Sequence, residues 1–91
     1  MQNNNKIKLV FPSFSCNEAF ARNVVACFVL NLNPSVSEIA DIKTAVSEAV
    51  TNCIVHAYPN SVGEIKMDAE IIDRVLHIVL FLFNCYVLIF F

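Results

Sequence analysis

The chain has 91 residues, which is enough for one small domain but not for two independent hydrophobic cores. It is 57% hydrophobic and only 15% charged, against a usual charged share of about a quarter, which indicates a protein that is incomplete or membrane-associated. The net charge of -2 and the pI of about 5.5 predict no basic patch, so we expect no direct binding of DNA or RNA.

The four cysteines form no Cys-x-x-Cys pair and have no histidine at metal-ligand spacing, so we interpret them as reduced cytosolic thiols. Cys27 and Cys53 fall at apolar positions of predicted helices, where a free cysteine packs as a small hydrophobe. The N-terminal residues lack the apolar stretch of about 7 to 15 residues that a signal peptide needs. We therefore expect a cytoplasmic protein.

The chain begins with a predicted strand and helix. Residues 6–11 show the alternation of a half-buried strand, which Pro12 ends. Ser15 and Glu18 have capping-box spacing and predict a helix that runs to about Leu32. The predicted apolar face of this helix consists of Phe20, Val24, Cys27 and Phe28.

A second capping box, Ser35 with Glu38, predicts a longer helix that ends near Tyr58, because Pro59 cannot continue it. Lys43 falls inside the apolar stripe of this helix and must extend its ammonium group toward water. The stripe consists of Ile39, Ile42, Val46, Ala49, Val50, Cys53 and Ile54.

Two strands follow the second helix. Residues 64–71 alternate between apolar and charged side chains, which predicts an antiparallel strand with one wet face. Asp73 and Arg74 form a short turn into residues 75–80, the predicted hairpin partner.

The chain changes character after Arg74, because the last 17 residues contain no glycine, no proline and no charge apart from any on His77. Their length is at the lower limit for a membrane helix, and His77 and Asn84 interrupt them. Their phenylalanine, valine and isoleucine content favours an aggregation-prone strand extension or an aberrant tail. A membrane span stays as the second interpretation.

Glu48, Asn52 and His56 follow one another at intervals of four residues, so they form a polar stripe on the long helix. A solvated face is one interpretation. A ligand or partner face is the other, because Asn is a poor residue inside a helix, and Ala45 and Val55 stand where a wet face would carry charge.

Residues 42–58 contain the run S-E-A-V-T-N, followed by His56 and Tyr58, and resemble the N-box helix of the anti-sigma F factors. They resemble more distantly that of the GHKL ATPases, which include histidine kinases. Residues 17–22 resemble the first helix of the same family, and the likeness covers about residues 6–80. It implies an α+β fold of two layers, a mainly antiparallel sheet with two helices on one face, as in a truncated GHKL or Bergerat-type ATP-binding domain.

The resemblance implies a cytoplasmic serine kinase that uses ATP and Mg²⁺, holds a sporulation sigma factor of the sigma F type inactive, and phosphorylates an anti-anti-sigma factor. Asn52 corresponds to the magnesium ligand of the cofactor site, and Glu48 to the catalytic base. Glu18 and Arg22 form either a surface ion pair or, as the resemblance implies for Arg22, part of the partner-binding surface. A homodimer is left open, and His56 is interpreted as a helix-end cap or as a residue at the edge of the core.

The chain departs from the family after the hairpin. The D-x-G-x-G box and the glycine-rich lid are missing, and the one glycine is Gly63. We therefore expect a partial kinase domain over residues 1–80, its N-box half, and a divergent apolar tail over residues 81–91, from a truncated or frame-shifted copy with impaired catalysis. The alternatives are a non-catalytic remnant that binds a sigma factor or another partner, and a small membrane-anchored protein that uses the tail.

Overall fold

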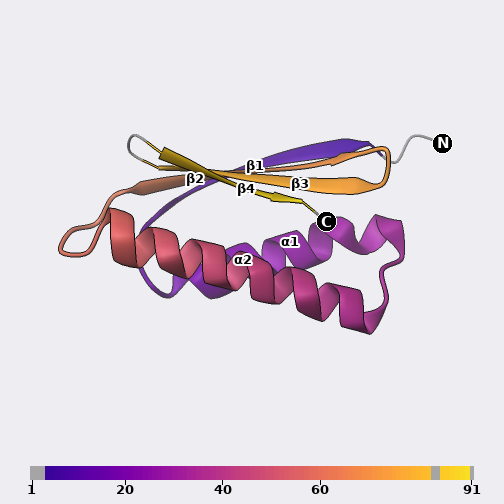
Figure 1. Ribbon diagram of the computed structural model, residues 1–91, viewed down its shortest axis with the longest axis horizontal. Coiled ribbons are helices and arrows are strands. Elements are labelled where there is room, and N and C mark those ends of the chain that lie inside the picture. The colour runs from indigo at the N-terminus through magenta and orange to yellow at the C-terminus, as the bar shows by residue number, and fades with distance from the viewer. Residues whose placement is uncertain (1–3, 83–84, 91) are drawn as a thin grey trace.

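A computed structural model describes residues 4–82 and 85–90, which form two layers, a sheet and a pair of helices (Figure 1). The elements in chain order are β1 (Asn5–Pro12), α1 (Asn17–Phe28), the 3₁₀ helix η1 (Val29–Leu32), α2 (Val36–Ala57), β2 (Glu64–Ile72), β3 (Val75–Leu82) and β4 (Cys85–Phe90).

Within the described residues, the sheet has four strands in the order β1-β2-β3-β4, and every neighbouring pair is antiparallel. Phe11 pairs with Ile65 across β1 and β2, and Asp68 pairs with Val79 across β2 and β3. Both α-helices lie side by side against the same face of this sheet (Figure 1). The predicted α+β fold, with a mainly antiparallel sheet and two helices on one face, is confirmed.

The hydrophobic core lies between the sheet and the helices. The alternation predicted for residues 64–71 holds in β2, where the four apolar residues of that range are buried while Glu64 and Lys66 are exposed. β3 continues the same pattern, because every second side chain of a strand points to the same face of the sheet, and in β3 these side chains face the helices. The buried side chains of the two strands are Ile65, Met67, Ala69, Ile71, Leu76, Ile78 and Leu80.

The predicted turn at Asp73 and Arg74 is present and has positive φ at both residues, 50° and 68°. Two central residues with positive φ match the twist of a tight hairpin, although neither residue is a glycine. Contacts with other segments hold the turn: the Asp73 N–H donates to Asn4 Oδ1 at 3.0 Å, and Arg74 Nη2 donates to the Leu32 carbonyl at 3.2 Å.

Helix α2 begins with the predicted capping box. The Glu38 N–H donates to Ser35 Oγ at 3.0 Å, and the Ser35 N–H donates to Glu38 Oε1 at 2.9 Å. The backbone N–H of Ser35, and then its hydroxyl, hold the pKa of the Glu38 carboxyl below its ordinary value. From Ile42 onward the predicted apolar stripe faces the core, where Ile42, Val46 and Val50 are buried, and Cys53 is buried with them as expected. Ile39, the first residue of the predicted stripe, is only partly buried and lies outside the core cluster.

Helix α1 differs from its prediction at its start. Ser15 does not cap it: the N-cap is Cys16, without a side-chain hydrogen bond. The Glu18 N–H that a Ser15 hydroxyl would bind is instead 3.3 Å from the Ser15 carbonyl oxygen, in a backbone turn. The helix ends at Phe28, earlier than predicted, and the chain continues to Leu32 as the 3₁₀ helix.

The buried face of α1 is also offset by one residue from the predicted one. Ala21 and Val25 are buried, whereas Phe20 is 51% exposed and Cys27 is exposed, so the interpretation of Cys27 as a core residue is wrong. The sequence contains two adjacent apolar stripes with the same helical period. Packing selects the one with the smaller side chains, because Ala21 lets the helix lie close to its neighbours.

The connection from α2 to β2 is held at Gly63. The Gly63 N–H donates to Ser13 Oγ at 2.9 Å, and the Ser13 N–H donates to the Gly63 carbonyl at 2.8 Å. Tyr58 Oη donates to the Glu64 carbonyl at 3.0 Å, and its ring lies where a Cβ on residue 63 would stand. The glycine is therefore required by the close approach of the Tyr58 ring.

The apolar tail forms a strand as far as it is described, because β4 pairs with β3 from Cys85 to Phe90. In the part of the chain that the structure describes, no helix has the length and apolar character needed to cross a membrane. The proposed division at residue 80 stays a prediction, and residues 83, 84 and 91 of the predicted tail lie outside the described residues.

We predict that Ser35→Ala lowers the free energy of unfolding by about 1 kcal/mol, because it removes the side-chain cap of α2. Urea denaturation measures the change, and Ser37→Ala, an exposed serine in the same turn, is the matched control. The pKa of Glu38 is lowered by folding, so its stabilisation is present above the ordinary pKa and is lost as the pH falls through the lowered one. Equal losses for the two serine variants would contradict the cap.

Candidate functional site

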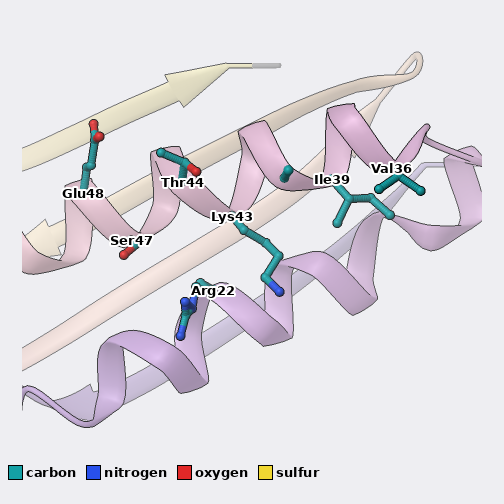
Figure 2. Close-up of a pocket in the computed structure, with 8 residues that line it drawn as sticks. Arg22, Val36, Ile39, Lys43, Thr44, Ser47 and Glu48 are labelled. Atoms are coloured by element: carbon teal, nitrogen blue, oxygen red, sulfur yellow. The ribbon is translucent and has the colours of Figure 1, made fainter.

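A groove of about 600 Å³ lies between α1 and α2 (Figure 2). One wall is a stripe of α2 in which residues recur every three or four positions, and the other includes Arg22 from α1. The lining residues are Arg22, Val36, Ile39, Ala40, Lys43, Thr44, Ser47 and Glu48. The groove is apolar near Val36 and polar near Glu48, so its two ends suit different chemical groups.

Arg22, predicted as a partner-binding residue, forms the expected ion pair with Glu18 one turn earlier on α1. The Arg22 Nε to Glu18 Oε2 distance is 3.2 Å, and both atoms are shielded from solvent. The two side chains are 34% and 21% exposed, which leaves this pair less open to water than an ordinary surface pair. Glu18 therefore restrains the guanidinium at the edge of the groove.

Lys43 lies in the same groove as Arg22, and Figure 2 shows both side chains in the space between the helices. Lys43 was predicted to extend out of the apolar stripe, and it is half-buried. Among residues 4–82, no hydrogen bond or ion pair holds its ammonium group. The groove thus contains a cation from each helix, and only the one on α1 has an acidic partner.

Glu48, the predicted catalytic base, is exposed and lines the polar end of the groove (Figure 2). The fold therefore brings Glu48 and Arg22 to one groove from different helices. Asn52 follows Glu48 by one helical turn and is exposed, but it does not line the groove. His56 is exposed in the last turn of α2, consistent with its interpretation as a helix-end residue.

The groove includes residues that were not predicted as part of a site. Thr44 and Ser47 supply hydroxyl groups beside Glu48, and Val36, which is 87% exposed, supplies an apolar surface at the far end. A signal for them exists in the sequence, because they recur at helical spacing along a second stripe next to the apolar one. The sequence alone does not show that this stripe lines a groove, because the groove depends on where α1 packs.

The described residues contain no group of three or more histidine, cysteine, aspartate or glutamate side chains that could hold a metal ion. The Asn52 amide is exposed and makes no hydrogen bond within the described ranges, so its oxygen is accessible.

A family model matches the part of the chain that contains the two helices and the β2–β3 hairpin. The model of the histidine kinase-like ATPase domain matches residues 17–81, which is most of the chain. The chain belongs to the histidine kinase-like ATPase domain family. This assignment agrees with the GHKL character predicted from the N-box residues.

This chain is similar to curated proteins that are named anti-sigma F factor. The one from Caldanaerobacter subterraneus subsp. tengcongensis is 60% identical over 74 residues, 81% of this chain and 52% of the relative. The one from Thermoanaerobacter sp. strain X514 is 58% identical over 71 residues, which are 78% of this chain and 50% of the relative. The one from Clostridium botulinum strain Eklund 17B is 57% identical over 70 residues, which are 76% of this chain and 49% of the relative.

The chain therefore spans about half the length of the curated relatives it matches, and the likeness to anti-sigma F factors is confirmed.

Proposed function

We propose that this chain carries the partner-binding surface and the magnesium-binding helix of an anti-sigma F kinase. The proposal is carried by the groove that Arg22 of α1 and Glu48 of α2 both line, on a chain whose relatives are named anti-sigma F factors. A protein of this kind holds a sporulation sigma factor inactive in the cytoplasm. It phosphorylates a serine of the anti-anti-sigma factor with ATP.

Glu48 is proposed as the general base. Its carboxylate is exposed on α2 and borders the groove, so a hydroxyl group of a protein substrate can reach it without rearrangement of the core. A carboxylate at hydrogen-bond distance from that hydroxyl accepts its proton as the oxygen attacks. Thr44 and Ser47 line the same end of the groove and can bind the backbone of the incoming segment.

Asn52 is proposed to bind Mg²⁺ through its amide oxygen. The residue is one turn beyond Glu48 on the same exposed side of α2, so a metal at Asn52 lies near the base. Bound Mg²⁺-ATP supplies the phosphoryl group, and the metal offsets the negative charge that develops on it. Asn52 would be the protein ligand of this ion, and Mg²⁺ bound in this way would keep several water ligands.

Arg22 is proposed to bind the sigma factor or the anti-anti-sigma factor, with Glu18 as the residue that orients it. Glu18 contacts the guanidinium at Nε, which leaves the two Nη groups for a carboxylate of a partner. Lys43 lies in the same groove without an acidic partner among the described residues and adds a second cation to this surface. An acidic group of the partner therefore fits between the two helices.

The sequence supplies only part of a nucleotide site. It contains one glycine, Gly63, and this residue closes the packing against Tyr58. A phosphate-binding loop needs glycines so that the backbone can approach the phosphates, and the D-x-G-x-G box that binds adenine in the family is not among these 91 residues. The kinase half over residues 1–80 and the tail over residues 81–91 remain our proposed division.

Arg22 and Lys43, the two cations that line the groove, also favour a second candidate function, a non-catalytic protein that binds a sigma factor or another partner through the α1–α2 surface. This function needs only Arg22, Glu18 and the groove. It requires neither ATP nor Mg²⁺, and nucleotide titration separates it from the first candidate.

We predict that Arg22→Glu weakens binding to a sigma factor by about tenfold or more, because it places a negative charge where a carboxylate of the partner would bind. The measurement is titration of residues 1–91 with sigma F from Caldanaerobacter subterraneus. Lys6→Glu, an exposed charge reversal on β1, is the matched control, and circular dichroism checks that helix content is unchanged. An unaltered affinity would leave Glu18 and Arg22 as a simple ion pair.

We predict that Asn52→Ala lowers the affinity for Mg²⁺-nucleotide by about tenfold or more, whereas His56→Ala has little effect, because only Asn52 supplies a metal ligand. Both residues are exposed on α2, so neither substitution disturbs the core. Titration with a fluorescent ATP analogue, with and without Mg²⁺, measures the difference. Equal losses for both variants would reject the assignment of Asn52.

We predict that residues 1–91 transfer phosphate far more slowly than a full-length anti-sigma F factor. Phosphoryl transfer depends on positioning and electrostatic stabilisation, and these residues lack the loops that fix the adenine and enclose the phosphates. Transfer of labelled phosphate to an anti-anti-sigma factor measures the rates side by side. A comparable rate would show that the 91 residues hold a complete site.

A further inference from the structure

A second cavity, of about 280 Å³, lies at the end of the molecule where the β2–β3 turn meets the connection between α1 and α2 (Figure 1). Among the described residues, none lines both this cavity and the groove that contains Arg22. Glu38 at its rim precedes Asn52 by almost four turns of α2, roughly 20 Å along the helix axis. The cavity is therefore separate from the proposed magnesium and partner sites.

The floor of this cavity is apolar and continuous with the core. It is formed by Val29 of η1, Ile42 of α2 and Leu76 of β3, all buried, with Leu32 packed against them. Side chains from three elements hold this floor in place. The volume is just below the range of about 300–1,000 Å³ that is typical of sites for drug-sized ligands. The cavity therefore suits a small molecule with an aliphatic group.

Two opposite charges, Arg74 and Glu38, line the same cavity. Arg74 Nη2 donates to the Leu32 carbonyl at 3.2 Å, and its other N–H groups make no hydrogen bond within the described residues, so they can bind a carboxylate. Glu38 Oε1 accepts from the Ser35 N–H at 2.9 Å, and the carboxylate keeps further lone pairs for a second donor. Over residues 4–82, no ion pair joins Glu38 to Arg74. A ligand with both charges can therefore bind each of them.

The backbone at Arg74 is an independent observation. Its φ of 68° is one that glycine adopts most easily, and glycine is the usual residue at this position of a tight hairpin turn. Asn33, which also lines the cavity, has a φ of 52°. Strained residues of this kind are concentrated at ligand sites. Since the turn by itself favours glycine, the contribution of Arg74 lies in its side chain.

We propose that this cavity binds a free α-amino acid with an aliphatic side chain, such as leucine. The α-carboxylate binds the guanidinium of Arg74, the α-ammonium group binds the carboxylate of Glu38, and the aliphatic chain contacts the apolar floor. One end of a peptide carries only one of the two charges, so a free amino acid fits this rim better than a peptide does.

Isothermal titration calorimetry of residues 1–91 with L-leucine tests the proposal. Saturable binding of one molecule per chain, with a dissociation constant of about 1 mM or less, is the expected result. Leucinamide lacks the carboxylate, 4-methylpentanoate lacks the ammonium group and glycine lacks the aliphatic chain, so each should bind at least about tenfold more weakly. An absence of L-leucine binding, or equal affinity for any of these three compounds, would overturn the proposal.

Two substitutions remove the charges and keep the local structure. Arg74→Gly suits the positive φ of the turn, and Glu38→Gln retains an oxygen that can accept the Ser35 N–H in the capping box. Each variant should bind L-leucine about tenfold more weakly or worse. Lys6→Gln, which removes an exposed charge on β1, is the matched control and should bind normally. Unaltered affinity in either cavity variant would contradict the assignment.

Nuclear magnetic resonance supplies a readout that requires no substitution. Addition of L-leucine should shift the amide signals of Asn33 and Arg74 and leave that of Asn52 in place. Shifts at Asn52 without shifts at Arg74 would place the ligand elsewhere and overturn the proposal. These measurements need neither a sigma factor nor nucleotide, so their outcome is independent of the proposed function.

Discussion

The burial of one face of the sheet beneath both helices is the constraint on which the other features depend. β2 and β3 place alternate apolar residues on that face, and α1 and α2 each place one stripe against it. A residue such as Met67 or Ile78, fully buried, stabilises the fold by about 1.5–3 kcal/mol relative to exposure. A typical hydrogen bond between uncharged groups contributes less, about 0.5–1.5 kcal/mol.

The groove between the helices is a consequence of the same packing. Because α1 and α2 lie side by side on one face of the sheet, the residues beside the buried stripe of α2 border α1 (Figure 1). Ala21 at the buried face of α1 permits the close approach, and Arg22, the next residue, then stands at the rim. Arg22 and Glu48, which are 26 positions apart in the chain, thus line the same groove.

The opposite face and the edges of the sheet show where polar and apolar surface remain. β1 and β2 carry paired charges such as Lys8 and Asp68, whereas β3 exposes Phe81 and β4 contains no charge. Charged residues on the β1–β2 half of the sheet oppose association there, whereas the β3–β4 half carries fewer of them. The charged residues of the sheet therefore lie on β1 and β2, whereas β3 and β4 contain none apart from any charge on His77.

The sequence by itself determined the first three strands, the long helix and the cap at Ser35, because alternation, helical period and capping chemistry are local properties. It also pointed to the family, through the run that contains Glu48 and Asn52. Only the tertiary structure decided which stripe of α1 is buried, whether Ser15 caps it, and that Lys43 and Arg22 share a groove. Two apolar stripes of equal period cannot be ranked locally, because the choice depends on the side chains that the helix meets across the core.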